Sequence, residues 1–90
     1  MATIDRIRDR LTEVFAPVRL DIVDESARHA GHAGSRPGGE THFRVTIVSA
    51  AFAGQNRVAR QRAVYGVLAD ELANQIHALS LIVLTPTELR

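Results

Sequence analysis

The sequence predicts a small α+β domain in which a three-stranded mixed sheet carries two helices on one face. Two segments repeat apolar residues at helical spacing, and three others have the apolar patterns of strands, in the order helix, strand, strand, helix, strand. The length of 90 residues is enough for one domain and too short for two, so we expect residues 1–90 to form a single domain. Because a helix precedes the third strand, we expect that strand to be parallel to one neighbour.

The first half of the chain predicts a helix over about 3–15 and strands over 18–23 and 42–48. Thr3 is the expected N-cap of the helix, and Pro17 ends it. Apolar residues at the helical period are Ile4, Ile7, Leu11, Val14 and Phe15. Apolar and polar residues alternate in both strands, which is typical of half-buried strands, and we expect the two to pair antiparallel.

Between these strands the chain is rich in Gly, Ala and Ser and holds little that could enter a core. This predicts a flexible loop over about 27–40. A connection of this length in a compact domain is usually functional or disordered.

In the second half, residues 50–53 predict a short turn closed by Gly54, followed by a helix over about 56–75. The helix has apolar residues at Val58, Tyr65, Leu68, Leu72 and Ile76. Residues 79–84 form a nearly continuous apolar run, which predicts a strand buried on both faces. Pro86 could open a final helical turn.

Composition restricts the possible functions. With no cysteine, the chain alone can form neither a disulfide nor a thiolate metal site. The first residues lack the continuous apolar stretch of a secretory signal, and no apolar run approaches the length of a membrane span, so we expect a soluble cytoplasmic protein without membrane contact. A formal charge of +1 argues against a positive electrostatic field over the whole molecule that would attract polyanions in general.

Four histidines are the candidate metal ligands. His29 and His32 lie three residues apart in the predicted loop, where they could share a metal or simply be solvated. His42 alternates away from the apolar side of its strand, which favours a surface or cross-strand role. His77 lies at the C-terminal end of the predicted second helix, where it could be an imidazolium stabilised by the helix dipole, a ligand or a switch.

Catalytic arrangements are poorly supported, and we expect no enzyme activity. Ser26 and Ser49 lie in no nucleophile motif. Asp24 and Glu25 are adjacent, and adjacent residues of an extended chain point to opposite faces, so they form no acid–base pair.

The start of the second helix carries Arg57, Arg60 and Arg62, with no acidic residue before Asp70. Counting 100° per residue places Arg57 and Arg62 beside the apolar stripe and Arg60 toward solvent. A turn followed by a basic helix is compatible with a nucleic-acid reader of the helix-turn-helix kind, with an acidic protein surface or with plain solubility. Three charges support only a weak, salt-sensitive affinity for nucleic acid.

Several short motifs together resemble the BolA family, in order and spacing, over nearly the whole chain. They are Asp24-Glu25-Ser26, His29, Glu40-Thr41-His42-Phe43-Arg44-Val45, Ile47-Val48-Ser49, Phe52, Gly54, Val58-x-Arg60-x-Arg62-x-Val64-Tyr65 and Ile76-His77-Ala78-Leu79. The resemblance implies an αββαβ domain similar to class II KH folds. Where many relatives read Arg-His-Arg in the long helix, this chain has Gln61 between two arginines.

The resemblance also implies a heterodimer with a monothiol glutaredoxin that shares a 2Fe–2S cluster. His77 matches the signature histidine, and His29 matches the loop ligand of the histidine-bearing subgroup, with His32 as a further candidate. The sulfur ligands would come from the glutaredoxin cysteine and a bound glutathione, so no cofactor is expected in the isolated chain. BolA-like proteins are also described as DNA-binding stress regulators, in which case Arg57, Arg60 and Arg62 would contact DNA.

Overall fold

The structure is a computed structural model, and it describes residues 2–25, 42–74 and 76–88. The predicted flexible loop over about 27–40 lies almost entirely outside these residues. In chain order the elements are α1 (Thr3–Phe15), β1 (Arg19–Asp24), β2 (His42–Val48), the 3-10 helix η2 (Ala50–Phe52), α2 (Arg57–Val67), α3 (Ala69–Asn74) and β3 (Ala78–Leu84).

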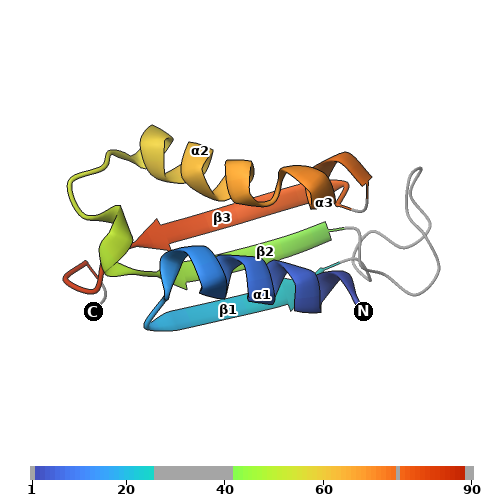
Figure 1. The fold of residues 1–90 in the computed structure, drawn as a ribbon, viewed down its shortest axis with the longest axis horizontal. Helices are drawn as coiled ribbons and strands as arrows, with labels where there is room; N and C mark the ends of the chain where they lie inside the picture. The colour runs from blue at the N-terminus through green and yellow to red at the C-terminus, as the bar shows by residue number, and fades with distance from the viewer. Residues whose placement is uncertain (1, 26–41, 75, 89–90) are drawn as a thin grey trace.

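The three strands form one mixed sheet in the order β1-β2-β3 (Figure 1). β1 pairs antiparallel to β2, with Leu20 opposite Ile47, and β3 pairs parallel to β2, with His42 opposite Ala78. The α+β class, the antiparallel first pair and the parallel third strand are therefore confirmed. The likeness to class II KH domains and the single-domain division over 1–90 stay predictions.

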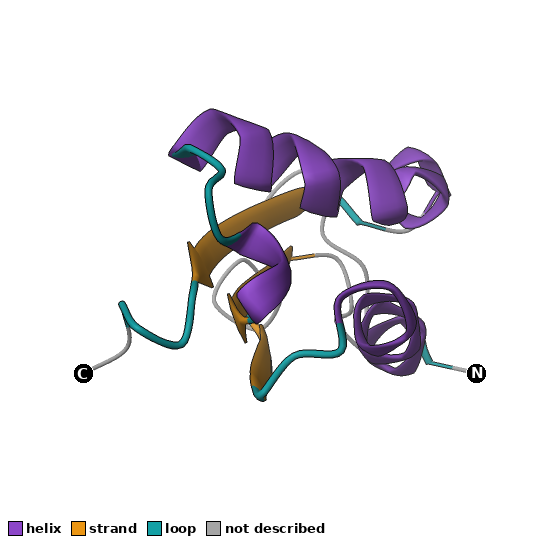
Figure 2. Ribbon diagram, turned by 60° about the vertical axis from the view of Figure 1, so that its left-hand side comes forward, coloured by secondary structure: helices purple, strands orange, loops and turns teal. Residues whose placement is uncertain are grey.

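The helices lie on one face of this sheet, as Figures 1 and 2 together show. The core forms between them and the inward side of β2, because alternate residues of a strand point to the same face. Its buried members are Ile7, Leu11, Phe43, Val45, Ile47, Phe52, Val64, Leu68 and Ile76. They come from α1, β2, η2 and α2, with Leu68 and Ile76 on either side of α3. The inward residues of β1 and β3 pack at the margin of this cluster.

The start of α1 differs from the prediction. Ala2, and not Thr3, is the N-cap, and Thr3 is the first helical residue and is buried. At the other end the backbone turns left-handed at Ala16 (φ 44°), whose N–H donates to the carbonyl of Thr12. Pro17 follows this turn, so the predicted end of the helix is confirmed.

The predicted second helix is two helices, because the α-helical path is interrupted at Leu68 (φ −98°, ψ 17°). α2 begins at a side-chain cap, in which the Asn56 side chain accepts a 2.8 Å hydrogen bond from the Ala59 N–H. Leu68 itself is fully buried, and its N–H still donates to the Val64 carbonyl at 3.1 Å. The interruption therefore divides the helix without exposing the apolar residue at which it occurs.

β3 is not buried on both faces as predicted. Its residues alternate between exposed and partly buried, and the side chain of Ile82 is 48% exposed. Leu79, Leu81 and Val83 pack against the core cluster. The outer face of the sheet has no helix in the described residues, so half of this apolar strand faces outward (Figure 2).

The turn between β2 and α2 is held by Ser49, which is buried. Its hydroxyl donates to the Phe15 carbonyl at 2.6 Å and accepts from the Ala51 N–H at 3.1 Å. Phe52 is fully buried, and its ring centroid lies 4.8 Å from that of Phe15. Gly54 has φ +80°, a left-handed conformation that favours glycine over any residue with a Cβ. The turn thus joins the end of α1 to the end of β2 before α2 begins.

Candidate functional site

The exposed side chain of His77 lies at one end of the sheet, immediately before β3. α3 ends at Asn74, so His77 lies just beyond the C-terminal end of this helix. Ile76 fixes the chain here, because its side chain is buried and its N–H donates to the Glu71 carbonyl at 2.8 Å. His77 is therefore an exposed imidazole on a backbone held by its neighbour.

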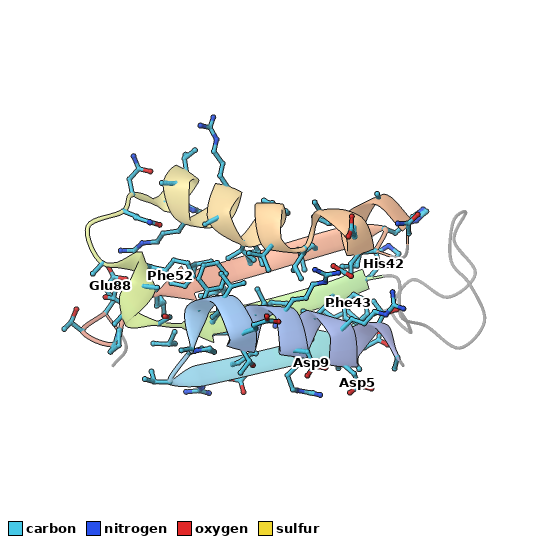
Figure 3. The ribbon with its side chains drawn as sticks, in the orientation of Figure 1. Asp5, Asp9, His42, Phe43, Phe52 and Glu88 are labelled. Carbon is cyan, nitrogen blue, oxygen red and sulfur yellow. The ribbon has the colours of Figure 1, made fainter. Side chains whose placement is uncertain are left out.

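The His42 ring lies next to that of His77, which the sequence did not predict. The ring centroids are 5.9 Å apart and the planes are 13° from parallel, a stacked arrangement. His42 thus has the expected cross-strand role, and the residue that it contacts is His77, the leading candidate ligand. The parallel register causes it, since His42 pairs with Ala78, the residue after His77 (His42 is labelled in Figure 3). Only a correct prediction of that register could have found the pair.

Glu25 and His42 both lie at this end of the sheet, and the two loop histidines fall between them in the sequence. The Glu25 N–H donates to the His42 carbonyl at 2.7 Å, so the described chain leaves and returns beside the histidine pair. His29 and His32 themselves lie outside the described residues. The Glu25 carboxylate also accepts a 2.6 Å bond from Arg44, one residue beyond Phe43 on β2. We call the end of the sheet with His42 and His77 the histidine end.

The donor set at the histidine end is made of imidazoles. Within residues 2–25, 42–74 and 76–88, no three His, Asp or Glu side chains gather closely enough to hold a metal. The whole sequence contains no cysteine. A 2Fe–2S cluster needs four ligands that are mostly thiolates, although two histidines can replace two cysteines on one iron. The residues present therefore fit the histidine half of such a cluster and not its thiolate half.

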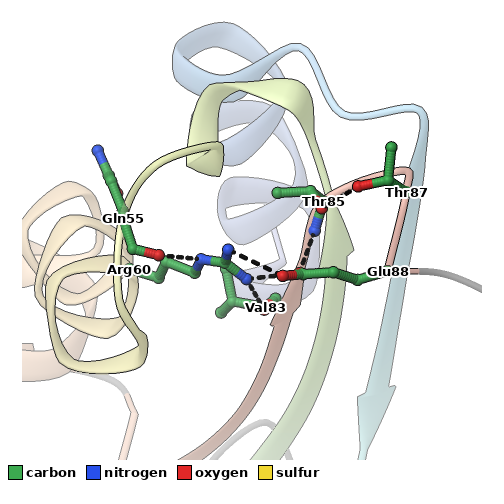
Figure 4. A network of polar contacts seen from close by, with 6 residues as sticks. All are labelled: Gln55, Arg60, Val83, Thr85, Thr87 and Glu88. Carbon is green, nitrogen blue, oxygen red and sulfur yellow. Dashed lines mark hydrogen bonds and ion pairs between the residues drawn. The ribbon is translucent and has the colours of Figure 1, made fainter.

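The opposite end of β3 carries the arginines of α2, and one of them is not oriented as predicted. Arg60 does not face solvent, because its side chain is only 13% exposed and forms a 2.6 Å ion pair with Glu88 (Figure 4). It also donates to the carbonyls of Gln55 at 2.9 Å and Val83 at 3.3 Å. Arg60 thus ties α2 to β3 and to the turn that follows β3.

Glu88 completes this network. Its carboxylate accepts two bonds from the Arg60 guanidinium and one from the Thr85 N–H. The hydrogen bonds from Arg60 and Thr85 lower the pKa of Glu88 from 4.5 to about 2. The expected final turn is present over 86–88, with the Glu88 N–H donating to the Thr85 carbonyl at 3.0 Å.

A groove of about 620 Å³ lies between the start of α2 and β3. Its lining is Gln55, Asn56, Arg57, Arg60, Gln61, Leu81, Ile82, Val83, Leu84 and Glu88. Arg57 and Arg62, which the helical count places beside the apolar stripe, are exposed, and only Arg57 of these two lines the groove. The three arginines therefore divide into one that stabilises the fold and two that are available to a ligand. We call this region the arginine end.

No helix among the described segments is long and apolar enough to cross a membrane.

The family model described as BolA-like protein matches residues 11–88. Protein BOLA1, chloroplastic, from Arabidopsis thaliana is 49% identical over 85 residues, which cover 92% of this chain and 53% of that protein. DNA-binding transcriptional regulator BolA from Escherichia coli K12 is 46% identical over 77 residues, which cover 86% of this chain and 70% of that protein.

A third relative is SufE-like protein 1, chloroplastic/mitochondrial, from Arabidopsis thaliana, at 47% identity over 87 residues. This chain spans about a quarter of that protein's length and about half that of the Arabidopsis BOLA1 protein. Among solved structures, BolA1 from Arabidopsis thaliana superposes with a TM-score of 0.88 at 41% identity, over 100% of this chain and 99% of that one. The identities, the family match over most of the chain and the shared fold agree: the chain belongs to the BolA-like protein family.

Proposed function

We propose that this chain is an adaptor that pairs with a monothiol glutaredoxin and supplies histidine ligands to a shared 2Fe–2S cluster, in iron–sulfur trafficking or iron and redox regulation. His77 and His29 are the proposed ligands from this chain, with His32 as the alternative to His29. The glutaredoxin cysteine and glutathione would supply the sulfurs. The chain itself would carry out no catalysis.

The observation that carries this proposal is the position of His77. It is an exposed imidazole on a fixed backbone, at the end of the sheet where the chain leaves at Glu25 and returns at His42. A partner that approaches this end would meet His77 without any rearrangement of the core. Histidine in place of thiolate raises the reduction potential of a 2Fe–2S cluster, which suits a cluster that is exchanged or sensed.

Anaerobic co-purification with the monothiol glutaredoxin of the same organism tests the proposal. We expect a coloured heterodimer with two iron and two sulfide ions per complex. His77→Ala should change the visible circular dichroism or speed cluster loss, while Arg57→Ala, at the arginine end, should change neither. His29→Ala and His32→Ala, compared in the same assay, identify the second ligand. An unchanged spectrum in His77→Ala would exclude His77 as a ligand.

A second candidate function is a DNA-binding transcriptional regulator. The relative from Escherichia coli carries that name, and Arg57 and Arg62 are exposed on the first turns of α2. With Arg60 held by Glu88, two phosphate contacts are expected, so log K should fall with log salt at a slope of about −2. Titration of duplex DNA at two salt concentrations measures it. A loss of all affinity at physiological salt, for every sequence tried, would exclude specific regulation by the isolated chain.

The compartment that we propose is the cytoplasm. Two Arabidopsis relatives have names that place them in chloroplasts or mitochondria, so the family is not confined to one compartment. Fractionation of the native cells, with detection by antibody, decides the location for this chain.

A further inference from the structure

We propose that His42 and His77 form a binding site for one divalent transition-metal ion, of the class of Zn²⁺, Ni²⁺ or Cu²⁺, in the isolated chain. This site does not depend on a glutaredoxin, on glutathione or on a cluster. The proposal can therefore be tested independently of the adaptor function. The observation behind it is the pair of stacked rings, with centroids 5.9 Å apart, at the exposed end of the sheet.

The backbones of both histidines are fixed before any ion arrives. His42 is the first residue of β2, where its carbonyl accepts from the Glu25 N–H and the next side chain, Phe43, is buried. His77 lies between the buried Ile76 and Ala78, which pairs with His42 across the parallel strands. Binding would therefore order only side-chain torsions, and this keeps the entropic cost small.

The separation of the rings suits a shared ion. Imidazole nitrogens bind Zn²⁺ at about 2.0–2.1 Å, so two nitrogens on one ion lie within about 4 Å of each other. The ring centroids are 5.9 Å apart, which leaves room for one ion between two ring nitrogens once the His77 ring rotates out of the stack. His77 is exposed and its outer torsion is broad, so this rotation meets little resistance.

The ligand chemistry selects the class of ion. Imidazole suits Zn²⁺, Cu²⁺ and Ni²⁺, whereas Ca²⁺ and Mg²⁺ require a set of oxygen ligands. Among the described residues, no third His, Asp or Glu forms a metal-binding group with the pair. Water would therefore fill the remaining coordination positions of the ion. The order of affinities should follow the general series, with Cu²⁺ bound most tightly.

Zinc titration of the untagged chain, without glutaredoxin or glutathione, tests the site. Isothermal calorimetry should give one ion per chain, and NMR should show the ring protons of His42 and His77 shifting together. His42→Gln and His77→Gln should each lower the affinity at least tenfold. The matched control is the double variant His29→Gln/His32→Gln, which keeps the pair and removes both loop histidines, and its affinity should stay within threefold of wild type.

Three results would overturn the site: no zinc binding, a ratio of one ion per two chains, or affinity that depends on His29 and His32 but not on His42. If His42→Gln fails to fold, the exposed His77→Gln variant and the ring-proton shifts of the wild-type chain still decide the question. Failure here would leave the glutaredoxin experiment unaffected, since that experiment reads cluster formation in the heterodimer.

Discussion

At the scale of single residues, the contacts of a side chain decide its role more than its type does. Arg60 and Arg62 are two positions apart on α2, yet Arg60 is held by Glu88 while Arg62 is exposed. His42 and His77 are 35 positions apart and yet stack. Arg60 therefore stabilises the fold, whereas the two histidines form a ring pair at the end of the sheet.

The Arg60–Glu88 contact predicts a pH-dependent stability. The pKa of Glu88 is lowered to about 2 in the folded chain, chiefly by the hydrogen bond from Arg60. Its stabilising contribution should thus be complete above about pH 4.5 and be lost as the pH falls through about 2. We expect Glu88→Gln to lower the melting temperature at pH 7 and the gap to wild type to close near pH 2.

Thermal unfolding followed by far-UV circular dichroism across this pH range measures the gap. Glu13→Gln, at an exposed position of α1, is the control and should melt like wild type at pH 7. A gap that stays constant down to pH 2 would show that Glu88 acts through packing and not through its charge.

At the scale of elements, a partly buried ion pair joins α1 to α3. The Arg10 guanidinium donates to the Glu71 carboxylate at 3.0 Å and lies 3.6 Å from Asp70. The Glu71 side chain is only 1% exposed, and its second oxygen has no hydrogen-bond partner among the described residues. A buried carboxylate is costly unless a cation compensates it, so Arg10 offsets the burial of Glu71.

This pairing predicts a non-additive response to substitution. Arg10→Ala should destabilise the chain by about 1–3 kcal/mol, because it leaves a buried carboxylate uncompensated. In a Glu71→Gln background the same change should cost clearly less, since no buried charge remains. Urea unfolding of the four chains of this double-mutant cycle gives the coupling energy. Equal costs in the two backgrounds would mean that Arg10 acts only through its packing.

At the scale of the whole molecule, the histidine end and the arginine end lie at opposite ends of β3. His77 precedes its first residue, and Glu88 follows its last by four positions, so the two ends are about 20 Å apart at the usual rise of a strand. Figure 3 shows His42 and Glu88 at opposite ends of the fold. Charges at such a distance are screened at physiological salt, where the Debye length is about 8 Å.

The separation predicts that the two ends act independently. His77→Gln should leave the affinity for duplex DNA within twofold of wild type, while Arg57→Gln/Arg62→Gln should lower it at least fivefold. The same arginine variant should bind zinc at the histidine end as wild type does. Fluorescence anisotropy and calorimetry on the same preparations measure both affinities. Weaker DNA binding in His77→Gln would indicate a shared surface or a coupling through the sheet.

The sequence by itself determined the elements and the family. Local periodicity placed α1 and the strands within about a residue, since helical and extended segments bury one face with periods that can be read in a short window. It also determined that the chain has no thiolate to offer. The short motifs identified the family because they depend on residue identity and spacing alone.

Only the tertiary structure decided how distant segments meet. The parallel register of β3 on β2 placed His42 against His77, and the final turn brought Glu88 to Arg60. The same structure left the outer face of β3 exposed and interrupted the second helix at Leu68. These features depend on strand pairing and packing between residues far apart in the chain, which local periodicity does not encode.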